Sequence, residues 1–467
     1  MPPKFGTSGL RGLVSDLTDA LVADYTRAFL AACPHGGALW LGQDLRPSSP
    51  RIAGAVAEAA RAEGVEVIDC GALPTPALAL AAMAAGQAAV MITGSHIPAD
   101  RNGLKFYVPT GEISKADEAA IGAALGRAPG GGAAARTQRE AADDYVARYL
   151  DGFGAEALKG LRIGVYQHSS VARDLMVEVV RGLGAEAVAL ARSDDFVPVD
   201  TEALDPDTRA MLAGWCAEHR LDAVISTDGD ADRPMVTDAA GTVVPGDVLG
   251  ALSARSLGAG LVCTPVSSNS MIGQMPEFDR VELTRIGSPF VIAAMEAALA
   301  RDPAARVVGY EANGGFLLGF MAEGPAGQLA PLMTRDCLLP ILAPLAAARA
   351  AGTSLAALVA RLPARFTAAD RIAGIPTATS QAFLARLRDD AGARAAFFEG
   401  AEAGLDLTDG LRVTLDGGAV VHLRPSGNAP EFRCYAEADS AETARALVAR
   451  YLAKLERTLG ESTVTTA

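Results

Sequence analysis

The sequence predicts an α/β protein of three similar α/β domains followed by a separate α+β domain. Two observations lead to this prediction. The chain has 467 residues, which is too many for one ordinary domain and is typical of about three. Half of its residues are hydrophobic, so large cores can form, and strand-like and helix-like segments alternate along most of its length.

Three rounds of this alternation can be followed along the chain. The first has an alanine-rich helical segment at 51–63, which Gly64 ends before a strand at 65–69. The other two rounds each have a strand, a helix and a strand, at 161–166, 171–183 and 187–190, and at 260–264, 288–299 and 306–310. Such alternation predicts β–α–β units in which helices cover the sheets.

The last hundred residues follow a different pattern. Apolar and polar residues alternate over 410–424 around an Asp-Gly turn, which predicts a β-hairpin, and a helix is expected at 441–459. A glycine-rich stretch at 126–133 predicts a loop or linker. We therefore expect four domains, at 1–143, 144–249, 250–363 and 364–467.

Charge and composition exclude some classes of protein. The chain has 41 lysines and arginines and 55 aspartates and glutamates, which gives a net charge of −14. This negative charge argues against a general nucleic-acid binder. No segment has the length and apolar character of a membrane span, and the first residues lack the apolar core of a signal peptide. The six cysteines are scattered, as in a reducing compartment. A soluble cytoplasmic enzyme is expected.

A Thr-Gly-Ser-His turn carries the first functional motif. It follows an apolar segment at 88–92, which predicts a buried strand, and ligand sites of open α/β sheets lie just beyond the carboxyl ends of strands. Ser95, with His96 beside it and Lys105 ten residues on, is therefore a candidate phosphate carrier. For the Ser-His pair alone, a simple polar turn is the alternative.

A second motif is acidic. Three aspartates stand at alternate positions after the apolar segment 221–225, namely Asp228, Asp230 and Asp232. We expect their carboxylates to converge on one side of an extended loop and to need a divalent cation, for which oxygen ligands favour magnesium. An EF-hand is excluded because its glycine and glutamate positions hold Arg233 and Ala239. A solvated acidic turn remains the alternative.

Two further segments offer ligand-binding groups. A Ser-Gly-Asn turn between Arg424 and Arg433 supplies guanidinium, hydroxyl and backbone donors that suit a phosphate dianion. Glu311 and Asn313 stand two apart after a strand, where a carboxylate and an amide can bind sugar hydroxyls. A plain turn is an equally good interpretation of this last segment.

In this order, the four motifs resemble those of the α-D-phosphohexomutase family, and the segment from Phe5 to Gly12, FGTSGLRG, fits its opening motif. The match runs from residue 5 to about residue 435, and its Asp-Gly-Asp-x-Asp-Arg motif is highly specific. The resemblance implies four domains around a central cleft, three of them related and with mixed sheets. It also implies transfer of a phosphoryl group between O6 and O1 of a hexose through a phosphoserine and a hexose 1,6-bisphosphate.

The resemblance assigns roles by position. Ser95 is the phosphoserine, His96 is its neighbour in the loop, and Lys105 and Arg11 transfer protons and stabilise charge. Magnesium has four ligands, the serine phosphate and Asp228, Asp230 and Asp232. The substrate is bound by Arg233, by Glu311 and Asn313 at its hydroxyls, and by Arg424, Ser426, Gly427 and Asn428, with Arg433, at the phosphate that is not transferred.

Several residues depart from the family pattern. Ile97 stands where many members have asparagine, Asn313 where serine is usual, Gly315 where histidine is often found, and Asn428-Ala429 where Thr-Glu is common. None removes an essential charge. The combination resembles the bacterial phosphomannomutases of the family more than the phosphoglucosamine mutases, so mannose phosphate is the expected substrate.

Other functions stay open at this point. Glucose or glucosamine phosphate could be the substrate of the same chemistry, and the protein could be a magnesium-dependent sugar phosphatase. A non-catalytic sugar-phosphate sensor could dispense with its nucleophile, whereas Ser95, Lys105 and the three aspartates are all present. We expect no nucleic-acid or membrane partner, and a monomer or a homodimer.

Overall fold

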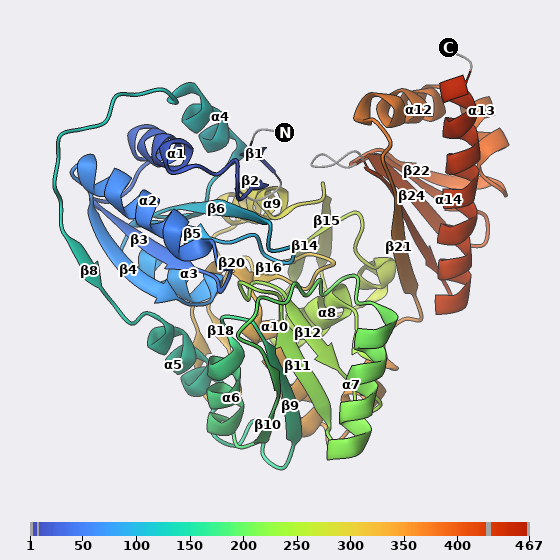
Figure 1. The fold of residues 1–467 in the computed structure, drawn as a ribbon. Coiled ribbons are helices and arrows are strands. Elements are labelled where there is room, and N and C mark those ends of the chain that lie inside the picture. Colours follow the sequence, from blue (N-terminus) through green and yellow to red (C-terminus); the bar gives the residue numbers. More distant parts are fainter. Residues whose placement is uncertain (1–2, 7–8, 426–430, 465–467) are drawn as a thin grey trace.

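The computed structural model describes residues 3–6, 9–425 and 431–464, and it has four sheets of five or more strands (Figure 1). The first, eight-stranded sheet is mixed, in the order β1-β2-β6-β5-β3-β4-β8 with β7 beside β6. Its strands are β1 (Lys4–Phe5), β2 (Leu10–Leu13), β3 (Ala38–Gln43), β4 (Glu66–Ala72), β5 (Ala88–Ile92), β6 (Arg101–Val108), β7 (Gly111–Glu112) and β8 (Arg136–Gln138). Its helices are α1 (Asp19–Ala32), α2 (Ser49–Ala62), α3 (Thr75–Ala84) and α4 (Lys115–Ala123).

The second sheet has five strands in the order β10-β9-β11-β12-β13. This part of the chain contains α5 (Ala142–Phe153), β9 (Arg162–His168), α6 (Arg173–Gly182), β10 (Glu186–Arg192), α7 (Pro206–His219), β11 (Ala223–Thr227), β12 (Pro234–Thr237) and β13 (Val243–Val244). Local sequence fixes the start of α7, since Asp205 caps this helix by accepting a hydrogen bond from the backbone N–H of Thr208.

The third sheet, β15-β14-β16-β17-β20, also has five strands. Its elements are α8 (Gly246–Ser256), β14 (Leu261–Pro265), η1 (Ser270–Gln274), β15 (Arg280–Thr284), α9 (Ser288–Arg301), β16 (Val307–Tyr310), β17 (Phe316–Leu318), β20 (Leu332–Asp336), α10 (Leu338–Ala350) and α11 (Leu355–Val359). A small separate sheet pairs β18 (Ala322–Glu323) with β19 (Gln328–Leu329).

The three sheets repeat one pattern of strand pairing. In the second and third sheets, one strand is parallel to a second strand, the second is parallel to a third, and the third begins a run of antiparallel pairs. The first sheet has the same run in β4, β3, β5, β6 and β2. The third strand of the pattern is β5, β11 and β16 in turn. These repeats confirm the prediction of three related α/β domains with mixed sheets.

The C-terminal part is an α+β domain with an antiparallel sheet in the order β21-β25-β24-β23-β22. Its elements are β21 (Phe366–Ala373), α12 (Thr377–Asp389), α13 (Ala391–Phe397), β22 (Glu402–Asp406), β23 (Leu411–Leu415), β24 (Val420–Pro425), β25 (Glu431–Ala438) and α14 (Ala441–Val464). The hairpin predicted over 410–424 is β23 and β24, and the predicted last helix is α14. Figure 1 shows this domain beside the rest, with α14 covering its sheet.

One hydrophobic cluster joins the first three domains and leaves out the C-terminal domain. One cluster of buried side chains runs from the first domain through the second to the third, and includes Trp40, Tyr145, Ile163, Val248 and Leu342. The C-terminal domain has a core of its own around α12, α14 and its sheet. The first three domains therefore share a continuous core, which holds their loops at fixed positions. Among the described helices, none is both long and apolar enough to cross a membrane.

Candidate active site

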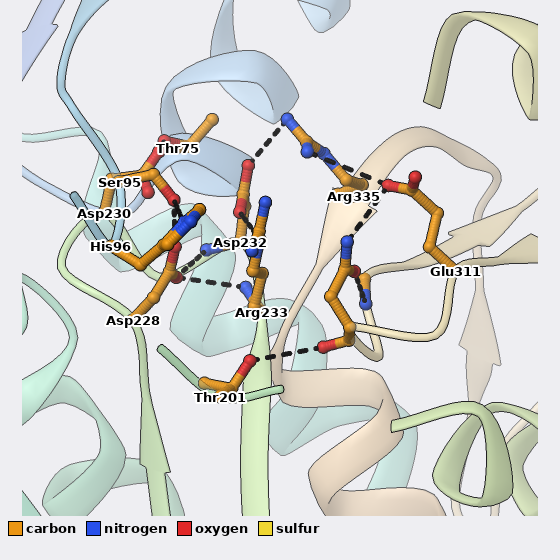
Figure 2. A network of polar contacts seen from close by, with 12 residues as sticks. Thr75, Ser95, His96, Thr201, Asp228, Asp230, Asp232, Arg233, Glu311 and Arg335 are labelled. Carbon is orange, nitrogen blue, oxygen red and sulfur yellow. Dashed lines mark hydrogen bonds and ion pairs between the residues drawn. The ribbon is translucent and has the colours of Figure 1, made fainter. Parts of the chain in front are cut away.

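Three polar loops occupy equivalent places in the three sheets and meet in one network (Figure 2). Each follows the third strand of the repeated pattern and precedes the antiparallel strand beside it. The loop after β5 carries Ser95, the loop after β11 carries the three aspartates, and the loop after β16 carries Glu311 and Asn313. The fold therefore brings together groups that lie more than 200 residues apart in the sequence.

Ser95 lies at the centre of this network. Its hydroxyl donates a close hydrogen bond to Asp228 Oδ2 and lies 3.3 Å from Nδ1 of His96. Its backbone has a φ of 56°, in the left-handed region that a serine seldom adopts, and its N–H donates to Thr93 Oγ1 at 2.7 Å. The first-domain nucleophile candidate thus points directly at the acidic loop of the second domain.

His96 is held in its neutral form. Burial lowers the pKa of His96 to about 2, and the positive charges of Arg233 and Arg11 act in the same direction. Its Nε2 lies 3.9 Å from Asp200. A neutral imidazole next to Ser95 can accept or donate a hydrogen bond without adding charge to the site.

The three aspartates are fully buried, and one carboxylate oxygen of each lies within 4.8 Å of the others. The prediction that they converge is correct, but the backbone is a compact turn and not an extended loop, because Ala231 has a φ of 58° and reverses the chain. Thr75 at the start of α3 donates to Asp230 at 2.6 Å.

Lys105 on β6 provides a positive charge for this cluster. Its Nζ lies 2.5 Å from a carboxylate oxygen of both Asp230 and Asp232. Burial alone would raise the pKa of Asp230, but Lys105 lowers it below its ordinary value. Burial and the two neighbouring aspartates raise the pKa of Asp228 well above its ordinary value.

The donor set fits a hard divalent cation. Oδ1 of Asp230 and Oδ1 of Asp232 are buried, and neither has a hydrogen-bond partner among the described residues. Buried carboxylate oxygens without a donor are costly unless a cation binds them, and magnesium prefers such oxygen ligands. The buried triad therefore has the composition and the unsatisfied atoms of a metal site.

Arg335 at the end of β20 was not predicted from the sequence. Its side chain is 4% exposed, and its Nη2 lies 2.8 Å from Asp232 Oδ2. It also lies 3.8 Å from Glu311 and 3.6 Å from Glu112 on β7, another residue that was not predicted. Arg335 thus connects carboxylates of all three α/β domains. A signal was present, since Thr-Arg-Asp interrupts an apolar run at 334–336.

The sugar-loop candidates lie side by side. Glu311 and Asn313 are both buried, and Asn313 Nδ2 lies 3.5 Å from Glu311 Oε2. Gly315 leaves room for Arg335, because a Cβ atom at this glycine would lie 2.9 Å from Cγ and Cδ of that arginine. The structure thus places an arginine side chain against the glycine that departs from the family pattern.

Two more predicted cations surround the acidic cluster. Arg233 Nε lies 3.9 Å from Asp232, and its Nη1 lies 3.7 Å from Glu202. On β2, Arg11 is close enough to Arg233 and to the aspartates to interact electrostatically with them. Burial, with the charge of Arg233, lowers the pKa of Arg11 to about 10.

The phosphate-loop candidates come from the C-terminal domain. Arg424 at the end of β24 pairs with Asp409 at 2.9 Å, and Arg433 on β25 pairs with Glu431 at 3.3 Å. Arg433 also interacts electrostatically with Glu202, the partner of Arg233, so the C-terminal domain reaches the same network. Ser426, Gly427 and Asn428 lie outside the described residues.

Family models match almost the whole chain. Domains I, II and III of phosphoglucomutase/phosphomannomutase, each described as α/β/α, match residues 2–128, 143–241 and 245–366. The C-terminal domain of phosphoglucomutase/phosphomannomutase matches residues 376–454. The four matches follow the order of the four sheets along the chain.

Curated proteins and solved structures agree with these matches. The chain is 46% identical to a phosphomannomutase of Sinorhizobium fredii, with 98% of this chain and 100% of the relative covered, and 43% identical to one of Salmonella muenchen, with 98% and 96% covered. A phosphoglucosamine mutase of Thermobifida fusca is 31% identical, with 96% of each covered.

Two solved structures share the fold. A phosphoglucomutase/phosphomannomutase family protein from Burkholderia thailandensis superposes with a TM-score of 0.75 at 22% identity, with 98% of this chain and 97% of the other covered. A phosphoglucomutase from Paramecium gives 0.70 at 16% identity, with 97% and 95% covered. Motifs, fold and sequence identity agree, and the chain belongs to the phosphoglucomutase/phosphomannomutase family of phosphohexomutases.

Proposed function

We propose that the protein interconverts mannose 6-phosphate and mannose 1-phosphate through a phosphorylated Ser95 and a hexose 1,6-bisphosphate intermediate. The observation that carries this proposal is the position of the Ser95 hydroxyl, hydrogen-bonded to Asp228 beside Asp230, Asp232 and Lys105. The names of the relatives at 46% and 43% identity support mannose as the sugar.

Each half-reaction exchanges one P–O bond for another. The bond between phosphorus and Ser95 Oγ breaks, a bond from phosphorus to a free sugar hydroxyl forms, and the hydroxyl proton ends on Ser95 Oγ. We assign the transfer of this proton to Lys105, which lies in the site with its side chain 4% exposed. The second half-reaction reverses these changes at the other end of the sugar.

Positioning and charge carry most of the catalysis in phosphoryl transfer. Asp228, Asp230 and Asp232, with the serine phosphate, would hold a magnesium ion, which would supply positive charge to stabilise the transferred phosphoryl group. Arg11 adds positive charge from the first domain, as does Lys105 when it is protonated. Neutral His96 keeps a hydrogen-bonding group beside Ser95 without adding charge to the site.

The other residues hold the sugar. Glu311 and Asn313 would accept and donate hydrogen bonds to its hydroxyls, and Arg233 would bind at the boundary of the second domain. Arg424, Ser426, Gly427 and Asn428, with Arg433, would grip the phosphate that is not transferred. The same phosphate-binding residues must serve both orientations of the bisphosphate, because the two half-reactions take place at opposite ends of the hexose. The central cleft, the cytoplasmic location and a monomer or homodimer remain part of the proposal.

A coupled assay tests this function. Mannose 1-phosphate with a catalytic amount of hexose 1,6-bisphosphate should give mannose 6-phosphate, and glucose and glucosamine 1-phosphates should turn over more slowly. Release of inorganic phosphate without isomerisation would instead indicate a sugar phosphatase.

The Ser95→Ala variant tests the nucleophile. It should lose nearly all activity and should lack the one phosphate that intact-mass analysis finds on the wild type. Ser15→Ala changes an exposed serine of the same domain and serves as the control. If Ser95→Ala keeps more than about a tenth of the activity, or the phosphate maps to another residue, the assignment is wrong.

A further inference from the structure

Arg46 is a buried arginine that holds the loop of Ser95 without touching the reacting groups. It follows β3 and is 1% exposed. Its Nη2 donates to the carbonyls of Ser95 and Ile97 at 2.8 and 2.6 Å. Its Nη1 donates to the carbonyls of Pro98 and Arg101 at 2.8 and 3.1 Å, and its Nε donates to Asp44 Oδ2 at 3.1 Å.

This arrangement uses the whole donor capacity of an arginine. A guanidinium has five N–H groups in a rigid plane, and here they have five acceptors, four of which are backbone carbonyls of one short loop. A lysine has three N–H groups on one atom and cannot span these carbonyls. The contact is also tight, since a Cβ atom at Gly94 would lie 2.7 Å from Cζ of Arg46.

Asp44 extends the same support to the other side of the loop. Its Oδ2 also accepts a hydrogen bond from the Thr93 hydroxyl at 2.8 Å, and Thr93 Oγ1 in turn accepts one from the N–H of Ser95. The carbonyl and the N–H of Ser95 are therefore both fixed by one buried ion pair. This explains how a serine with a φ of 56° is kept in a conformation that it seldom adopts.

Phe196 connects this support to the second domain. The Arg46 guanidinium carbon lies 4.1 Å from the centre of the Phe196 ring, a cation–π contact. The same ring lies against the aspartate loop that follows β11. A Cβ atom at Gly229 of this loop would be 3.2 Å from Phe196 and 3.0 Å from the carbonyl oxygen of Ser95. Phe196 thus fills the space where the serine loop and the aspartate loop meet.

We propose that Arg46 is a positioning residue that holds Ser95 at the correct place for phosphoryl transfer. We propose also that Phe196 keeps the loop of Ser95 in position against the aspartate loop. This inference rests on the proposed function of Ser95. Arg46 acts through the backbone of the loop, so its loss should affect the transfer step and not the binding of the sugar, which involves other domains.

The main test replaces Arg46 by lysine. Arg46→Lys keeps a positive charge beside Asp44, so the fold should survive, but it loses most of the carbonyl contacts. We expect kcat for mannose 1-phosphate to fall at least about tenfold, because several hydrogen bonds to a charged group are lost, while KM stays within about threefold. Arg51→Lys is the matched control, since Arg51 is exposed in the same domain and pairs with Asp19. It should leave both constants unchanged.

Hydrogen exchange gives a readout that does not depend on activity. In Arg46→Lys, amides of the peptide 94–102 should exchange at least about tenfold faster than in the wild type, and those of β9 and β16 should not change. Phe196→Ala should lower kcat by about two- to thirtyfold, from the loss of one cation–π contact, with KM unchanged. Unchanged kcat in Phe196→Ala would overturn the role of Phe196.

The outcomes separate this inference from the proposed function. If the wild type has no mutase activity, the proposed function fails. Hydrogen exchange of the peptide 94–102 still measures how strongly Arg46 stabilises the loop. If the wild type is active but Arg46→Lys keeps kcat within twofold, or loses activity through a proportional rise in KM, the positioning role is wrong. Faster exchange with an unchanged kcat also overturns it, because the contacts would then be structural only.

Discussion

Replacement of Arg335 by methionine removes one cation from a buried group of carboxylates and keeps a side chain of similar length. The guanidinium lies 2.8 Å from Asp232, and the two side chains are 4% and 0% exposed. Glu112 and Glu311 lie at 3.6 and 3.8 Å, beyond hydrogen-bonding distance. The pair with Asp232 is therefore the shortest of these three ion pairs that Arg335→Met removes.

The magnitude follows from the cost of an unpaired buried charge. Loss of one partner of a buried ion pair costs about 3–5 kcal/mol. The lower end applies here, because Asp232 keeps Lys105 as a second cation at 2.5 Å. At about 2–4 °C for each kcal/mol in a unit of 150–250 residues, a loss of about 3 kcal/mol lowers Tm by about 6–12 °C.

Thermal unfolding with and without magnesium is the assay. In the presence of a chelator, Arg335→Met should unfold about 6–12 °C below the wild type. Excess magnesium should raise Tm more in the variant than in the wild type, because a divalent cation supplies positive charge to the same carboxylates. Arg301→Met, at an exposed ion pair with Glu282, is the control and should shift Tm by less than about 2 °C. A variant that unfolds within 2 °C of the wild type in the chelator would refute this reasoning.

Three other predictions address the metal, the phosphate grip and pH. Chelation with EDTA should abolish mutase activity and magnesium should restore it, whereas a metal-stripped Asp230→Asn protein with full activity would contradict the metal site. Arg424→Ala should lower kcat/KM at least about tenfold for both mannose 1-phosphate and mannose 6-phosphate; an effect on only one of them would argue against a shared grip. Burial lowers the pKa of His422 from 6.5 to about 4, so stability should be complete above pH 6.5 and should fall by about 3 kcal/mol as the pH drops to about 4. In thermal unfolding between pH 7 and pH 4, His422→Gln should lack this part of the fall, and an equal fall in both proteins would show that His422 is not its source.

Local patterns predicted much of the fold and part of the site. The apolar run before Ser95 is β5, with all five residues buried, and the Asp-Gly turn joins β23 and β24 as expected. Periodicity and turn residues act over a few positions, so these features could be predicted from neighbours in the sequence.

Contacts between distant segments could not be predicted in this way. Arg335 follows Glu311 by 24 residues and Asp232 by 103. Strand pairing within the third sheet brings Arg335 to Glu311, and the packing of the second domain against the third brings it to Asp232. The left-handed conformation of Ala231 is equally hidden, because alanine gives no signal for a positive φ. For this reason an extended loop was predicted for the aspartates, and the compact turn was not.

The equivalent loops of the three sheets have a consequence for synthesis on the ribosome. The chain emerges from its N-terminus, so Lys105 can pair with Asp230 and Asp232 once the second sheet is complete, about a hundred residues before Arg335 is made. Until then Asp232 has Lys105 and Arg233 but lacks Arg335, and Glu112 lacks Arg335 as well as its third-domain donors Ser288 and Thr334. A nascent chain that stalls after the second domain therefore exposes carboxylates that lack their third-domain partners. These carboxylates gain their remaining partners only when the third domain folds against the first two.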